Sequence, residues 1–143
     1  MRVSAALGRK VVSLETAETV GTLDEFVVDP GRRRIIALGI GGVKHGNMLP
    51  WDGIEAFGSD AVTVRAADRV GNPDADVDRL AGKDHRFLDK RVLTDAGDEL
   101  GSLEDVEFDA DSGELQSLVL AGREIPALRL LGVGSYAVVV RAG

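Results

Sequence analysis

The side chains best suited to metal chemistry in this chain are few and scattered. The two histidines, His45 and His85, lie far apart, and neither has a second nitrogen ligand at metal-binding spacing. Residues 109–113 (Asp-Ala-Asp-Ser-Gly) are similar to the start of a calcium loop, but the twelfth position is Leu120 rather than a bidentate acid. The better interpretation is a hairpin turn in which Asp109 caps its own backbone.

The sequence gives equally little support for a phosphate-binding loop or a catalytic serine. Gly39, Gly41 and Gly42 follow a predicted strand, but the third glycine of a dinucleotide fingerprint and the helix after it are missing. Ser135 has a counterpart in Ser59, and each serine precedes a predicted strand. Because the sequence places no general base beside either serine, a structural role in a turn is favoured over a role as nucleophile. The absence of cysteine excludes disulfides, thiolate metal sites and cysteine nucleophiles. We therefore expect a non-enzymatic protein without a cofactor or metal.

An internal repeat organises the chain that carries these residues. Residues 20–42 recur as 100–122, and residues 50–66 recur as 126–142, so the first copy has extra residues near 42–49. Two copies indicate duplicated domains rather than an open solenoid. We assign 1–67 to the first domain, 68–84 to a linker and 85–143 to the second. Domains this small bury little core alone, so we expect the two to cover each other's apolar faces.

Each copy has the pattern of about five short strands. Val106 and Phe108 alternate with acidic residues, which is typical of a half-buried strand, and β-branched runs close both copies at 61–64 and 136–140. After Pro50 and Pro126, residues 51–57 and 127–131 have apolar side chains at helix-like spacing, enough for one helical turn. Residues 41–49 form a glycine-rich loop. The sequence thus predicts an all-β protein with at most one short helical turn per repeat.

The shared pattern resembles the PRC-barrel domain. The pattern begins with a glycine followed by a basic residue and a valine, and a strand that starts Leu-Gly-x-Leu comes next. An Asp-x-x-Gly hairpin turn follows this strand, and later a proline precedes a short apolar turn. The resemblance implies two tandem PRC-like β-barrels related by a pseudo-twofold axis, acting in protein interaction without catalytic residues. One departure is Asp89, which stands where the first copy has Gly8. The residues that carry the resemblance are Gly8, Val11, Gly21, Leu23, Phe26, Asp29, Leu38, Pro50 and Ile54, then Val92, Gly101, Leu103, Asp105, Val106, Asp109, Gly113, Leu118, Pro126 and Leu130.

Charge and hydropathy narrow the partner classes. The net charge is −7 and the pI is near 4.8, so we expect no nucleic-acid binding through a broad basic face. The basic run 32–34 is a solvated turn. No segment has the length of a membrane span or a signal peptide's apolar region, so a cytoplasmic location is expected.

Trp51 and the longer loop of the first copy form the candidate partner surface. Trp51 is the only tryptophan and its counterpart is Ala127; core or interdomain packing is the commoner role for such a residue. The candidate surface comprises Trp51, Met48, Leu49, Lys44 and His45, with Met48 and Leu49 expected to be exposed. The predicted function is an adaptor that binds another protein, and duplication favours a monomer. The alternative is a small-ligand or metal-ion binding protein that uses the cleft between the barrels.

Overall fold

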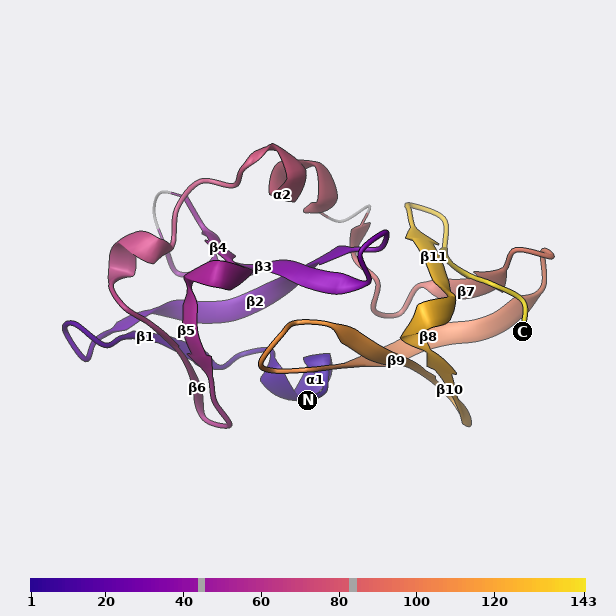
Figure 1. Ribbon diagram of the computed structural model, residues 1–143, viewed down its shortest axis with the longest axis horizontal. Helices are drawn as coiled ribbons and strands as arrows, with labels where there is room; N and C mark the ends of the chain where they lie inside the picture. Colours follow the sequence, from indigo (N-terminus) through magenta and orange to yellow (C-terminus); the bar gives the residue numbers. More distant parts are fainter. Residues whose placement is uncertain (44–45, 83–84) are drawn as a thin grey trace.

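The computed structural model describes residues 1–43, 46–82 and 85–143. Strands make up 49% of the chain and helices 14%. The strands form two six-stranded sheets, and Figure 1 shows the first in indigo and magenta and the second in orange and yellow. The all-β prediction is confirmed. In the described residues each sheet is an open series of strands, without pairing between its two end strands.

The two sheets have the same strand order, which confirms the predicted duplication. The first runs β4-β3-β2-β1-β6-β5 and the second β10-β9-β8-β7-β12-β11. The pairs β1–β6 and β7–β12 are parallel, at matched places. The strands are β1 Lys10–Ser13, β2 Thr19–Asp29, β3 Arg34–Gly41, β4 Met48–Pro50, β5 Ile54–Phe57, β6 Ala61–Val64, β7 Arg91–Thr94, β8 Glu99–Phe108, β9 Leu115–Leu120, β10 Arg123–Pro126, β11 Leu130–Val133 and β12 Val138–Val140; the helices are α1 Val3–Ala6 and α2 Ala75–Leu80; the 3₁₀ turns are η1 Trp51–Gly53, η2 Ala67–Arg69 and η4 Ala127–Arg129.

The copies also share their backbone irregularities. A bulge follows Val11 in the β1–β2 pair and Val92 in the β7–β8 pair, and such bulges bend and twist the strands alike. Gly8 has φ +90° and its counterpart Asp89 has φ +66°. Aspartate tolerates this left-handed region better than most residues, which explains why it can replace the glycine there.

Four strands, β4, β5, β10 and β11, were not predicted. The single helical turn expected within 51–57 and 127–131 is a 3₁₀ turn at Trp51–Gly53 and Ala127–Arg129, but the rest of each segment is strand. The end of the glycine-rich segment 41–49 belongs to β4, which pairs with β3. Each copy therefore has six strands rather than about five. Four-residue strands that follow a turn are too short for periodicity to separate strand from helix.

The two copies meet at their hairpin turns. The backbone N–H of Ile35 donates to the carbonyl of Gly113 at 2.8 Å, and the N–H of Leu115 donates to the carbonyl of Arg33 at 2.9 Å. Ile35 matches Leu115 in the repeat and Arg33 matches Gly113, so the contact is reciprocal, as a pseudo-twofold axis requires. Beside it, the rings of Phe26 and Phe108 lie 5.3 Å apart in one core that draws on both copies.

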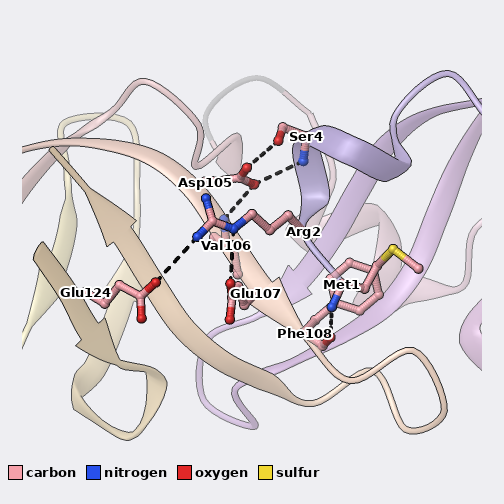
Figure 2. Close-up of polar contacts among 8 residues, drawn as sticks. All are labelled: Met1, Arg2, Ser4, Asp105, Val106, Glu107, Phe108 and Glu124. Atoms are coloured by element: carbon pink, nitrogen blue, oxygen red, sulfur yellow. Dashed lines mark hydrogen bonds and ion pairs between the residues drawn. The ribbon is translucent and has the colours of Figure 1, made fainter. Parts of the chain in front are cut away.

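A second reciprocal contact comes from the segments that precede β1 and β7. Ser4 donates its backbone N–H to the Asp105 carboxylate at 3.0 Å and its hydroxyl to the other oxygen, while Gly82 donates its N–H to the Glu25 carboxylate at 3.3 Å. Glu25 and Asp105 are matched positions, so each copy's leading segment docks on the long strand of the other. Figure 2 shows the first of these contacts.

Residues at the start of the chain extend this dock along β8. Met1 and Phe108 exchange backbone hydrogen bonds of 2.9 and 3.2 Å, and the Arg2 guanidinium lies 3.0 Å from Glu107 and 3.5 Å from Glu124 (Figure 2). The hydrogen bond to Glu107 raises the pKa of Arg2, so its charge is constant at any working pH. These ion pairs are solvent-exposed and contribute little stability. The buried part of the dock is the Ser4–Asp105 contact.

We expect Asp105→Ala to lower the free energy of unfolding by about 1–3 kcal/mol, because the N–H groups of Ser4 and Val106 lose their carboxylate acceptor. Urea denaturation followed by circular dichroism measures the change. Glu104→Ala, at the exposed neighbouring position, is the control and should stay within about 0.5 kcal/mol of wild type. Equal losses in both variants would contradict a specific role for the Asp105 dock.

Candidate functional site

Two of the five residues of the predicted partner surface are buried. Met48 is 7% exposed and Leu49 is fully buried, so the expected exposure of both is wrong. Leu49 points into the main core, and Met48 packs under α2 with Val77 and Leu80. The linker helix covers this segment, a long-range contact that local sequence does not reveal. Lys44 and His45 lie outside the described residues, and the partner-binding role of the set remains a prediction.

Trp51 lies at the junction of the two copies. Its ring stacks on Phe57 with centroids 6.0 Å apart, and its edge meets Phe108 at 6.4 Å. A methyl group added to Gly113 would lie 3.0 Å from the indole, so the tryptophan is packed closely against the second hairpin turn. Trp51 is only partly buried and also lines a shallow pocket of about 270 Å³ with Arg32, Arg34 and Asp52 among others. Interdomain packing accounts for its position.

The acidic and glycine motifs have structural roles. Asp109 accepts hydrogen bonds from the backbone N–H groups of Asp111 and Ser112 at 2.8 and 3.2 Å, which confirms the predicted turn. The side chains of Asp24 and Glu25 lie where side chains at Gly41 and Gly39 would be, so these glycines make room for the neighbouring strand. Within the described residues, no three His, Asp or Glu side chains gather closely enough to hold a metal ion.

The second copy presents large apolar side chains to solvent along η4 and β11. Leu128 is 75% exposed, Leu131 41% and Tyr136 64%. Leu128 lies in η4, Leu131 in β11, and Tyr136 in the turn between β11 and β12. The short turn η4 connects β10 and β11, which are the two end strands of the second sheet (Figure 1). We call these three residues the β11 face.

The first copy has carboxylates at the three matched positions. Asp52 corresponds to Leu128, Glu55 to Leu131 and Asp60 to Tyr136, and all three acids are exposed. The same backbone therefore folds with charged residues at these places. Folding therefore does not require apolar side chains at these positions. Exposed apolar clusters commonly mark interaction sites, which is the role that we consider for the β11 face.

Tyr136 is held in place by Arg91 of β7. The guanidinium lies 4.4 Å from the centre of the tyrosine ring and donates a hydrogen bond of 3.0 Å to its hydroxyl. Arg91 also approaches Glu99 at 3.7 Å. An aromatic ring restrained in this way loses little conformational entropy when a partner packs on it, which suits it to an interface.

The β11 face was not predicted from the sequence, because Leu128 and Leu131 belong to an apolar segment with helix-like spacing, a pattern that is also typical of core residues. The signal that could have found them is the exchange of Asp52 and Glu55 for leucines at matched positions, which is visible in the repeat alignment.

We expect the double substitution Leu128→Asp and Leu131→Glu, which copies the first repeat, to change the free energy of unfolding by no more than about 0.5 kcal/mol. Urea denaturation measures it. The control is Leu130→Ala at the buried neighbouring position, 2% exposed, which should cost about 2–5 kcal/mol. A loss comparable to that of the control in the face variant would mean that the leucines serve folding.

Comparison with known proteins agrees with the repeat analysis. The family model of the PRC-barrel domain matches residues 82–140. No curated protein matches the chain. No helix among the described residues is long and apolar enough to cross a membrane. The first half has the strand order of the matched half, with the same parallel pair and bulges. Residues 82–140 are therefore similar to the PRC-barrel domain, a general protein-interaction module, and the first half of the chain repeats the strand order of the matched part.

Proposed function

We propose that this protein is a non-enzymatic adaptor that binds another protein through the β11 face. The observation that carries the proposal is the contrast between the copies: Leu128, Leu131 and Tyr136 are exposed where the first copy has three carboxylates. A cytoplasmic location and a monomeric state fit this role and are part of the proposal. The PRC-barrel domain supports it as a module of protein interaction.

The chemistry of the face suits protein recognition. Leucine and tyrosine side chains supply apolar area that a partner removes from water, at roughly 25 cal/mol per Å². Tyrosine is enriched in the energetically important positions of interfaces, whereas exposed leucines elsewhere on a monomer occur singly. Leu128 and Leu131 are three residues apart, so one partner surface can contact both.

A pocket between the copies supports the second candidate, a small-ligand binder. It has a volume of about 390 Å³, within the range of small-molecule sites. Val3, Leu7 and Phe26 from the first copy and Phe87 and Leu88 from the second form its apolar lining, and Asp24, Glu25, Arg86 and Asp89 add charge. An apolar ligand with a cationic group would suit this lining.

Affinity capture from the native cytosol tests the adaptor function. The bait is the full chain, compared with the Leu128→Asp, Leu131→Glu variant and with Leu14→Glu, which removes an exposed leucine 51% accessible on the first copy. A captured protein is then purified and its dissociation constant measured. We expect the face variant to bind at least about tenfold more weakly and Leu14→Glu to bind like wild type.

Two results would contradict the adaptor function. One is a captured protein that binds the face variant as tightly as wild type. The other is capture of no protein while native mass spectrometry of the purified chain shows a bound small molecule, which would favour the pocket between the copies.

A further inference from the structure

Charge is distributed unevenly along the chain, and the β11 face lies at its least acidic end. Residues 115–143 contain three arginines and a single glutamate, whereas the other 114 residues hold 23 of the 24 carboxylate side chains. The face thus lies within a locally basic part of an acidic protein. In space, Asp95 lies beside the end of this segment, where it accepts a hydrogen bond of 2.8 Å from the Ala142 N–H, so the basic character at the face comes from its own arginines.

Two arginines border the leucines of the face. Arg129 lies between Leu128 and Leu131 in sequence, and its Nε donates to the carbonyl of Arg141 at 2.8 Å. Arg141 in turn donates its backbone N–H to the carbonyl of Arg129 at 2.7 Å, which holds the two residues side by side. Among the described residues neither guanidinium has a carboxylate within ion-pair distance.

Within residues 128–131, apolar and basic side chains stand where the first copy has acidic ones or glycine. Residues 52–55 read Asp-Gly-Ile-Glu in the first copy, and the matched residues 128–131 read Leu-Arg-Leu-Leu. Leucines stand where the first copy has two carboxylates, and Arg129 stands where it has Gly53. The two copies therefore differ at these positions both in hydrophobicity and in the sign of the charge.

We propose that the partner segment is acidic and carries at least two large apolar side chains. Its apolar side chains pack on Leu128 and Leu131, and its carboxylates pair with Arg129 and Arg141. This inference rests on the proposed function and adds the chemistry of the partner. Charge pairs at the rim raise the association rate and select against basic partners. Burial of the apolar area of Leu128, Leu131 and Tyr136 contributes to the affinity.

Other occupants fit less well. Two copies that met face to face would bring their arginines together, and the acidic counterpart face with Asp52, Glu55 and Asp60 offers no large exposed apolar side chain to a neighbouring copy. An anionic membrane would attract the arginines but repel a chain of net charge −7. An acidic segment of a separate protein can pack apolar side chains on the two leucines and pair its carboxylates with the two arginines.

The test uses a display library of random dodecapeptides, selected on the immobilised full-length chain and counter-selected on the Leu128→Asp, Leu131→Glu variant. We expect the enriched peptides to hold an excess of Asp and Glu together with two or more large apolar residues. Their affinities, measured by fluorescence polarisation, should fall with rising salt. Arg141→Glu should weaken binding about tenfold or more. Arg65→Glu, the same charge change at the matched exposed position of the first copy, should leave affinity unchanged.

The outcomes separate the two proposals. Enriched peptides that need Leu128 and Leu131 but are neutral or basic would overturn the acidic partner and leave the adaptor function standing. If no peptides distinguish the wild type from the face variant, both fail. Concentration-dependent dimerisation lost in the face variant, or binding to phosphatidylglycerol vesicles lost in it, would overturn the inference in favour of a second copy or a membrane.

Discussion

The reciprocal contact between the two hairpin turns is the constraint on which the structure depends. Ile35 and Leu115 each donate a backbone hydrogen bond across the junction, and Phe26, Phe108 and Trp51 pack beside them. Each copy alone is small for a stable domain, and the core that joins them compensates for this. The leading segments strengthen the junction, since each docks on the other copy's long strand. The inner surfaces of the copies are therefore committed to each other.

Because the inner surfaces of the two copies pack against each other, only their solvent-exposed outer surfaces can differ in side-chain character. Matched positions keep the same backbone conformation, such as the positive φ of Gly8 and Asp89, while Asp52 and Leu128 occupy matched exposed positions with opposite character. A duplicated fold can in this way keep one copy as a charged, solvated partner and develop a binding face on the other. The proposed adaptor function follows from this division between the copies.

The parts of the fold that local physics determines could be predicted from the sequence. The alternation of Val106 and Phe108 with acids indicated a strand, and the Asp109 turn was recognised from its own residues. The burial of Met48 and Leu49 could not be predicted, because it depends on pairing with β3 and on α2 packing from the linker. The β11 face was missed although the repeat carried a signal for it: Leu128 and Leu131 look like core residues beside Leu130, but the structure shows that both face solvent, as do the acids at their matched positions.

The central claim, that the two copies form one folding unit through their shared junction, is tested most directly by urea unfolding of the full chain with two probes. Trp51 fluorescence reports the junction and far-ultraviolet circular dichroism reports both sheets. The account predicts a single transition with the same midpoint for both probes, as in a two-state domain. A second circular dichroism transition that persists after Trp51 has become solvent-exposed would show that one copy folds without the other and would contradict it.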